Sequence, residues 1–146
     1  MISLEHIFKK YPFRIRNISP EAEIAVIENE FNIKFPQDYK HYLMHYEGYE
    51  DFIGKEYVEL WSVDELKKSN DGCCIQKWIP SFFGIGSNMG GELIALERTS
   101  SDHFIVKLTP LIGMSREDSI EIGNSFSDFL IRLESGREWF DFLDER

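Results

Sequence analysis

Two histidines one helical turn apart, His41 and His45, are the residues of this chain that come nearest to a metal-binding motif. Zinc proteases place two histidines at this spacing on a helix and use a glutamate directly after the first as general base. Here Tyr42 follows His41, the other histidines are His6 and His103, and the chain contains no C-x-x-C pair. We therefore interpret His41 and His45 as surface histidines and expect no metal site.

A glycine-rich segment, residues 84–91, invites comparison with nucleotide-binding loops. The dinucleotide fingerprint needs its third glycine three residues after the second, followed by a helix. Gly90 lies four residues after Gly86, and the next residues, 92–97, are typical of a strand. There is also no Lys-Ser or Lys-Thr pair for a phosphate loop. The segment predicts a tight hairpin turn whose glycines supply positive φ, and we expect no bound cofactor.

Nucleophilic catalysis has little support in the sequence. There is no G-x-S-x-G elbow, and the cysteines, Cys73 and Cys74, are adjacent. A disulfide between neighbours closes almost no loop and strains the backbone, so two reduced thiols of a cytoplasmic protein are predicted, with a vicinal redox switch as the alternative. His103 would serve these thiols as a base only if folding brought it close. We predict a protein that is not an enzyme, and keep a small uncharacterised enzyme as a distant alternative.

The charge of the chain bears on its partners. The 146 residues include 16 Lys and Arg against 26 Asp and Glu, a net charge of −10. Such a balance argues against nucleic acid, whose phosphates need clustered basic residues, and favours a basic protein partner. No apolar run approaches the roughly 18 residues of a membrane span. Glu5 and His6 interrupt the region where a signal peptide needs an apolar core, so we expect a cytoplasmic protein without membrane contact.

Acidic residues are concentrated between positions 47 and 65, where Lys55 is the only base and aromatic residues are interleaved. Aromatic side chains beside charges are typical of protein interfaces. The predicted docking surface consists of Tyr49, Glu50, Asp51, Phe52, Glu56 and Glu59. The alternatives are a merely solvated face with Phe52 in the core, or a docking surface at the acidic, aromatic residues 139–145.

Hydrophobic periodicity and capping signals define the elements that must position these residues. They predict helices within residues 19–32, 35–48, 62–70 and 125–136, and strands at 57–61, 82–86, 92–97 and 103–108. Ser62 and Glu65 form a capping-box pattern, and Ser125 is typical of a helix start. Two helices, then consecutive strands, then a helix indicate one α+β domain spanning residues 1–146, with an antiparallel sheet.

The inward faces of these elements predict the core. Trp61 ends a strand, while Tyr39 and Leu43 share one face of the second helix. Phe126 and Leu130 share one face of the last helix. Each side chain is apolar and in phase with the buried side of its element, so we expect these residues to be buried near one another.

In this order the motifs resemble the SUKH superfamily, which is named partly after the fungal Smi–Knr regulators of cell-wall glucan synthesis. The resemblance covers residues 19–135. The residues that carry it are Pro36, Tyr39, Leu43, Gly48, Trp61, Gly86, Gly91 and Phe126, together with Gly90-Gly91-Glu92 and Ser125-Phe126. It implies an α+β fold with a strongly bent antiparallel sheet packed by helices.

The resemblance also implies a function without catalysis by this chain. Bacterial members of the superfamily are immunity proteins that bind and neutralise a cognate polymorphic toxin, often a nuclease or deaminase, and fungal members are regulatory adaptors. A nuclease toxin has a basic substrate groove, which a chain of charge −10 would complement. We therefore expect a toxin-neutralising immunity protein, with a regulatory interaction adaptor as the alternative.

Overall fold

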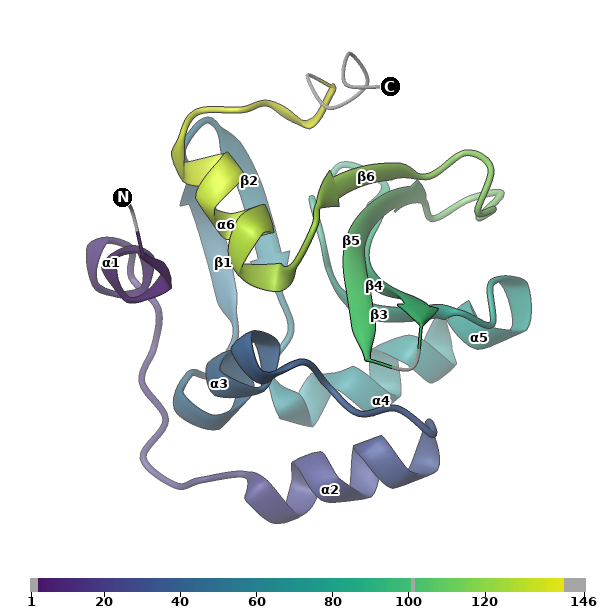
Figure 1. Ribbon diagram of the computed structural model, residues 1–146, viewed down its shortest axis with the longest axis horizontal. Coiled ribbons are helices and arrows are strands. Elements are labelled where there is room, and N and C mark those ends of the chain that lie inside the picture. Colours follow the sequence, from purple (N-terminus) through teal and green to yellow (C-terminus); the bar gives the residue numbers. More distant parts are fainter. Residues whose placement is uncertain (1–2, 101, 141–146) are drawn as a thin grey trace.

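One antiparallel sheet with a strong bend organises the molecule, whose computed structural model describes residues 3–100 and 102–140 (Figure 1). The six strands pair in chain order, each with the next, so the sheet is a meander. They are β1 (Tyr49–Ile53), β2 (Glu56–Leu60), β3 (Phe82–Ser87), β4 (Glu92–Ser100), β5 (His103–Pro110) and β6 (Ile120–Gly123). The expected α+β class with a bent antiparallel sheet is confirmed.

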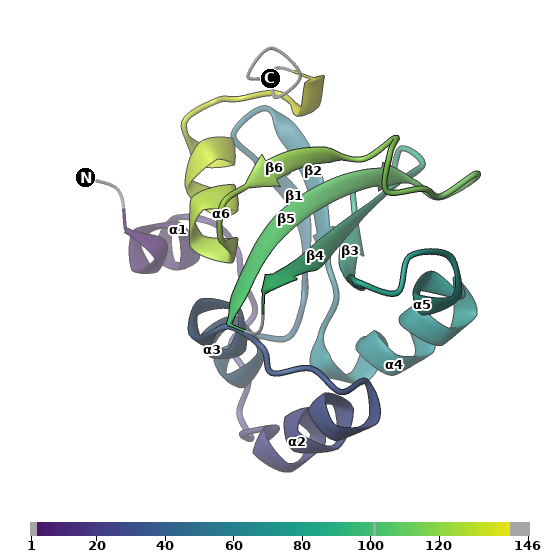
Figure 2. The same ribbon diagram turned by 45° about the vertical axis from the view of Figure 1, so that its right-hand side comes forward.

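Six helices surround this sheet in the described part of the chain. They are α1 (Leu4–Lys10), α2 (Glu21–Glu30), α3 (Gln37–His45), α4 (Val63–Gly72), α5 (Ile75–Trp78) and α6 (Phe126–Glu134). Helix α6 lies between the β1–β2 hairpin and β6, and it contacts β1, β5 and β6 (Figures 1 and 2). Helices α4 and α5 pack against β3, while α1 and α3 pack against α6.

The bend of the sheet lies at the seam between β2 and β3. Only two residue pairs join these strands, Glu59 with Ser87 and Leu60 with Gly86. A Cβ atom on Gly86 would lie 1.9 Å from the carbonyl oxygen of Glu59, so only glycine allows this close approach. The short seam leaves the β1–β2 hairpin turned away from the four-stranded part, as both ribbon views show.

The predicted capping residues lie at the starts of the last two long helices, α4 and α6. The Glu65 carboxylate accepts hydrogen bonds from the backbone amide and the hydroxyl of Ser62 at the start of α4, at 3.0 and 3.1 Å. The Ser125 hydroxyl accepts from the backbone amide of Asp128 in α6. Helix α3 ends at His45, three residues before Gly48. The predicted range 35–48 had this helix end at Gly48, but Gly48 takes φ +76° at the entry to β1.

The predicted core residues are buried together. Tyr39, Leu43 and Leu130 have no exposed surface, and Phe126 and Trp61 retain 1% and 8%. The rings of Tyr39 and Phe126 meet edge to face at 5.1 Å. The Tyr42 hydroxyl donates to the carbonyl oxygen of Trp61 at 3.0 Å, which ties α3 to the end of β2. The buried faces predicted for the helices that the structure places at α3 and α6 are therefore confirmed.

Four short elements were not predicted: α1, β1, α5 and β6. Strand β1 carries Glu50 and Asp51 in its centre, so its sequence lacks the apolar alternation of a strand. Helix α5 and strand β6 have only four residues each, which is too short for a periodic signal. Within the described residues, three helices thus precede the sheet and two lie between β2 and β3.

Candidate protein-binding site

The outward side of the β1–β2 hairpin brings acids and aromatic rings together. In the antiparallel register Glu50 lies opposite Glu59, and Phe52 lies opposite Tyr57. These four residues are called the hairpin face below. Phe52 is 53% exposed and its ring meets that of Tyr57 edge to face at 5.3 Å. The Tyr57 hydroxyl donates to Glu50 Oε2 at 2.9 Å, and this hydrogen bond raises the pKa of Tyr57.

Tyr49 does not belong to this surface, which corrects the sequence prediction. Its ring stacks on Phe13 at 4.1 Å, and the residue is only 6% exposed. Burial raises the pKa of its hydroxyl, which donates to the carbonyl oxygen of Phe52 at 2.7 Å. Tyr49 points inward because it shares the strand face of Ile53, opposite to that of Phe52. It therefore supports the hairpin from beneath, and Phe52, which the alternative put in the core, lies at the surface.

The four predicted docking acids differ in how strongly the fold holds them. Glu50 and Asp51 are exposed. Glu59 is half-buried, and its Oε1 accepts from Ser87 Oγ at 2.8 Å and from Trp61 Nε1 at 3.3 Å. Glu56, also half-buried, accepts the backbone amide of Trp139 at 2.7 Å. Glu50, on the same strand face as Phe52, is therefore the carboxylate best placed for a partner at the hairpin face. Asp51 lies on the opposite strand face and accepts the Phe52 amide, and Glu56 and Glu59 are held by contacts within the fold.

Strand β1 is an edge of the sheet, and its own side chains protect part of that edge. The backbone amide of Phe52 donates to Asp51 Oδ1 at 2.7 Å, and its carbonyl oxygen accepts from the Tyr49 hydroxyl. Backbone groups bound in this way are not available to pair with another strand. At Phe52 this edge is therefore closed to pairing with another strand.

The tip of the hairpin is fixed against α1 and α6. The backbone amide of Gly54 donates to the Tyr11 hydroxyl at 3.1 Å, and that hydroxyl donates to the Glu134 carboxylate. Lys10 Nζ lies 2.7 Å from the same carboxylate. Burial acts to raise the pKa of Glu134, but the hydrogen bonds from Lys10 and Tyr11 outweigh it and the pKa is lowered. A surface held in this way loses little conformational freedom on binding.

An acidic hollow of about 280 Å³ adjoins the hairpin face at the base of the hairpin. Its charged lining residues are Arg14, Glu47, Glu50, Glu59 and Glu65. The sequence placed the glutamates in one acidic run, but it gave no sign that Glu65, from α4, would face Glu50. Four carboxylates around one guanidinium leave the hollow suited to a Lys or Arg side chain of a partner.

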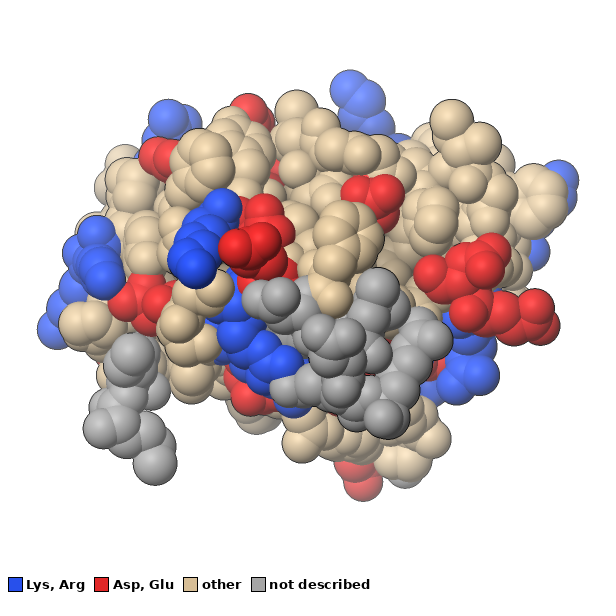
Figure 3. Space-filling model, turned by 90° about the horizontal axis from the view of Figure 1, so that it is seen from above, with Lys and Arg blue, Asp and Glu red and all other residues tan. Residues whose placement is uncertain are grey.

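The other predicted surface, at residues 139–145, begins beside the same hairpin. Trp139 is buried and stacks on Phe129 with ring centres 6.2 Å apart, whereas Phe140 is 65% exposed. Residues 141–145 lie outside the described residues. Lys55 at the hairpin tip pairs with Glu138 at 3.9 Å. Figure 3 shows this end of the molecule, where acidic and basic side chains lie side by side instead of forming one acidic field.

The residues considered for metal, nucleotide or thiol chemistry lie in ordinary surroundings. His41 Nε2 is 3.0 Å from Glu5 Oε1, and His45 Nδ1 is 2.9 Å from the carbonyl oxygen of His41. Within residues 3–100 and 102–140, no three His, Cys, Asp or Glu side chains are grouped so as to hold a metal ion. The predicted turn between β3 and β4 comprises only residues 88–91, since Gly84 and Gly86 lie inside β3. Of the four glycines in residues 84–91 only Gly91 takes positive φ, at +101°, so the expectation that the glycines supply positive φ holds for Gly91 alone. Cys73 and Cys74 are free and exposed.

The helices of the described residues include none with the length and hydropathy that crossing a bilayer requires.

A meandering antiparallel sheet curled into a half-barrel around α6, with further helices packed on it, defines an α+β fold of the SUKH type. The chain belongs to the SMI1 / KNR4 family (SUKH-1), whose family model matches residues 19–132. The resemblance seen in the sequence is thereby confirmed. A relative, the uncharacterized protein YnaB of Bacillus subtilis (strain 168), is 24% identical over 131 residues, which cover 87% of this chain and 86% of YnaB. The family includes toxin immunity proteins and is generally non-enzymatic.

Proposed function

We propose that this protein is an immunity protein, which binds a basic toxin domain of the nuclease or deaminase type and neutralises it by covering its active site. Family membership supports the class of function. The observation that carries the proposal is the hairpin face, where exposed Phe52 packs against half-buried Tyr57 beside carboxylates and next to the acidic hollow. Aromatic anchors ringed by charges are the pattern that protein interfaces favour.

Neutralisation of this kind needs no chemistry from the bound protein. A toxin that acts on nucleic acid must present basic side chains to phosphates. A chain of net charge −10 attracts such a surface over a distance comparable to the Debye length and raises the rate of encounter. Phe52 and Tyr57 then supply apolar contact area, and the acidic hollow accepts a basic side chain. The substrate of the toxin is excluded because this protein covers the surface of the toxin to which the substrate must bind.

The proposal requires a toxin domain encoded next to the gene of this protein, and the test uses that domain. We expect the purified chain to form a one-to-one complex with that domain and to abolish its catalytic activity at equimolar concentration. Phe52→Ala should weaken inhibition by about 5- to 150-fold, because hot-spot aromatics contribute about 1–3 kcal/mol. Val26→Ala, a truncation at an exposed apolar residue of α2 far from the hairpin, is the matched control and should inhibit normally.

Two results would contradict the proposal. A complex that leaves the toxin fully active would favour the regulatory adaptor, which the same family also contains. Full inhibition by the Phe52→Ala variant at wild-type affinity would place the docking surface elsewhere on the molecule.

A further inference from the structure

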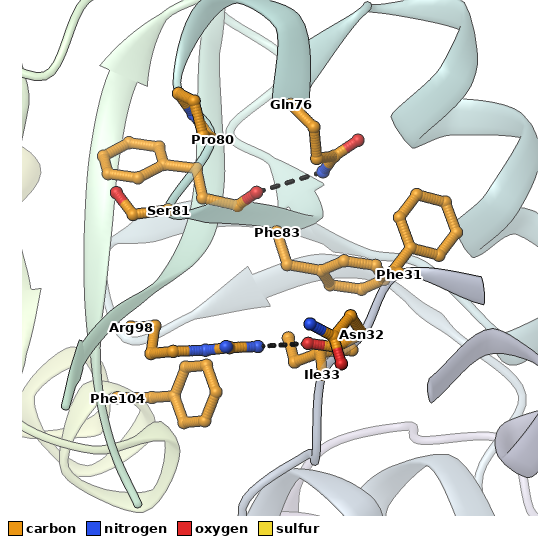
Figure 4. Close-up of a pocket in the computed structure, with 10 residues that line it drawn as sticks. Phe31, Asn32, Ile33, Gln76, Pro80, Ser81, Phe83, Arg98 and Phe104 are labelled. Atoms are coloured by element: carbon orange, nitrogen blue, oxygen red, sulfur yellow. Dashed lines mark hydrogen bonds between the residues drawn. The ribbon is translucent and has the colours of Figure 1, made fainter. Parts of the chain in front are cut away.

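A second concave site is formed by residues from the end of α2, from α5 and from the neighbouring strands (Figure 4). It is a pocket of about 390 Å³, which falls within the range of small-molecule sites. The end of α2, the segment between α5 and β3, and the neighbouring ends of β4 and β5 form its walls. The proposed toxin contact, the hairpin face, does not include any residue of this pocket.

Phenylalanine side chains form much of the pocket wall. Phe31 and Phe83 meet edge to face at 5.3 Å, and Phe104 is only 6% exposed. Figure 4 shows the ring of Phe104 and those of Phe31 and Phe83 on different sides of the same space. Aromatic rings prefer to pack against other rings in offset or edge-to-face geometry. The walls therefore suit a flat aromatic ligand.

The C-terminal end of α2 presents a backbone carbonyl to this space. Asn32 takes a left-handed conformation with φ 51°. Its backbone amide donates a hydrogen bond to the carbonyl oxygen of Asn29, and the backbone amide of Ile33 donates to the carbonyl oxygen of Glu28. These are the two hydrogen bonds of a Schellman motif. The carbonyl oxygen of Asn32 then accepts a 2.6 Å hydrogen bond from Arg98 Nη2. This bond fixes the guanidinium at the pocket (Figure 4).

Arg98 is the one charged residue that lines the described pocket. Its guanidinium carbon lies 5.8 Å from the ring centre of Phe104, and its amide donates to the carbonyl oxygen of Ser81. No carboxylate within residues 3–100 and 102–140 forms an ion pair with Arg98. A guanidinium has five N–H donors, so most of them stay available beside the aromatic walls.

The surroundings of Arg98 differ in charge from the rest of this acidic protein. An adjoining hollow of about 480 Å³ shares Arg98 and adds Lys34 and Glu28. Glu28 is already engaged, since it accepts the amide of Phe35 at 2.8 Å and pairs with Lys40 at 3.8 Å. An anion at the pocket would consequently meet Arg98 and Lys34 before any uncompensated carboxylate.

We propose that this pocket binds a small aromatic carboxylic acid. The ring lies among Phe31, Phe83 and Phe104, and the carboxylate accepts charge-assisted hydrogen bonds from the free N–H groups of Arg98. The inference is independent of toxin binding, because the pocket and the hairpin face share no residue.

The test is a titration of the full-length, isotope-labelled protein with phenylacetate, followed by amide chemical shifts. We expect saturable shifts at Ser81, Arg98 and Phe104 with a dissociation constant on the order of 1 mM, the scale for a ligand of this size. Phenylacetamide keeps the ring and shape without the charge, and acetate keeps the charge without the ring. Each should bind at least about tenfold more weakly, because each lacks one of the two proposed contacts.

An Arg98→Gln variant should weaken phenylacetate binding about tenfold, whereas Lys77→Gln removes the same charge from an exposed residue outside the pocket lining and should leave it unchanged. Equal binding of phenylacetate and phenylacetamide, or absence of saturable shifts at the pocket, would overturn the proposal. Tighter binding of the tripeptide glycyl-glycyl-phenylalanine than of phenylacetate would overturn the assignment to a small acid and favour a polypeptide carboxyl terminus.

Discussion

Two aromatic residues three positions apart on β1, Tyr49 and Phe52, have opposite roles. Tyr49 stacks on Phe13 in the core, whereas Phe52 contacts Tyr57 at the surface. We expect Tyr49→Ala to lower the free energy of unfolding by about 3–5 kcal/mol, as other buried aromatic truncations do. Phe52→Ala should lower it by less than about 1 kcal/mol. Urea denaturation of the two variants measures both values, and equal losses would mean that Phe52 is a core residue.

Glu134, which accepts hydrogen bonds from Lys10 and Tyr11 at the tip of the β1–β2 hairpin, makes the stability of the protein depend on pH. Its side chain is only 5% exposed, and its pKa is lowered by the hydrogen bonds from Lys10 and Tyr11, which outweigh the opposing effect of burial. A carboxyl group whose pKa is lower in the folded than in the unfolded state stabilises the protein above the unfolded pKa. That stabilisation is fully present above the unfolded pKa of glutamate, about 4.3, and is lost as the pH falls through the lower folded pKa.

We therefore expect Glu134→Gln to destabilise the protein by about 1–2 kcal/mol at pH 7, and by progressively less as the pH is lowered below about 4. Denaturation curves of the variant and the wild type across pH 3–7 (roughly the range that spans glutamate titration) measure the difference. Glu23→Gln, an exposed residue of α2, is the control. A difference that stays constant with pH would contradict the role of the ionised Glu134.

At the scale of single residues, the sequence predicted the core better than the surface. Trp61, Leu43 and Leu130 each fall in phase with a strong apolar pattern, so their burial follows from periodicity alone. Tyr49 was misplaced because β1 was not predicted, and without a strand there is no alternation to assign its face. The contact between Tyr11 and Glu134 joins residues 123 positions apart, and no local pattern encodes it.

Among the elements, β3 depends on a glycine where it meets β2. A Cβ atom on Gly86 would lie 1.9 Å from the carbonyl oxygen of Glu59, which is backbone and has no room to move alone. We expect Gly86→Ala to destabilise the protein by more than about 2 kcal/mol, because the seam must open. Thermal or urea denaturation measures the loss.

Gly72, the last residue of α4, provides the matched control for this substitution. A Cβ atom there would meet nothing within 4 Å. Gly72→Ala should be neutral or stabilising by up to about 1 kcal/mol, since alanine favours helix over glycine. Similar losses in the two variants would show that the seam between β2 and β3 is looser than the structure indicates.

Elements with strong local signals were predicted, and those defined by tertiary contacts were not. The Ser62–Glu65 pair and the Ser125 cap determine where α4 and α6 begin, and both lie within four consecutive residues. Strand β6 has four residues and is defined by its pairing with β5. Helix α5 likewise depends on packing against β3, where a Cβ on Gly84 would meet Ile75 Cδ1 at 2.6 Å.

For the whole molecule, the fold class followed from the order of the elements, but the shape of the binding surface did not. The acidic hollow combines Glu47 and Glu50 with Glu65 from α4 and Arg14 from the N-terminal segment. These residues come from the N-terminal segment, the residues before β1, the β1–β2 hairpin and α4, so the fold and not the order of acids in the sequence brings them together. The sequence indicated the acidic region and the aromatic residue Phe52, and the fold determined which carboxylates are held and which are exposed.

The central claim, that this protein docks a basic toxin domain through its acidic hairpin, is tested most directly by association kinetics with the neighbour-encoded toxin at several salt concentrations. Glu47→Lys combined with Glu50→Lys reverses two exposed charges at the acidic hollow, and Glu21→Lys combined with Glu23→Lys reverses two on α2. We predict that the first pair slows association about tenfold or more and flattens its dependence on salt, whereas the second has a much smaller effect. Equal association rates for the two double variants would contradict the claim.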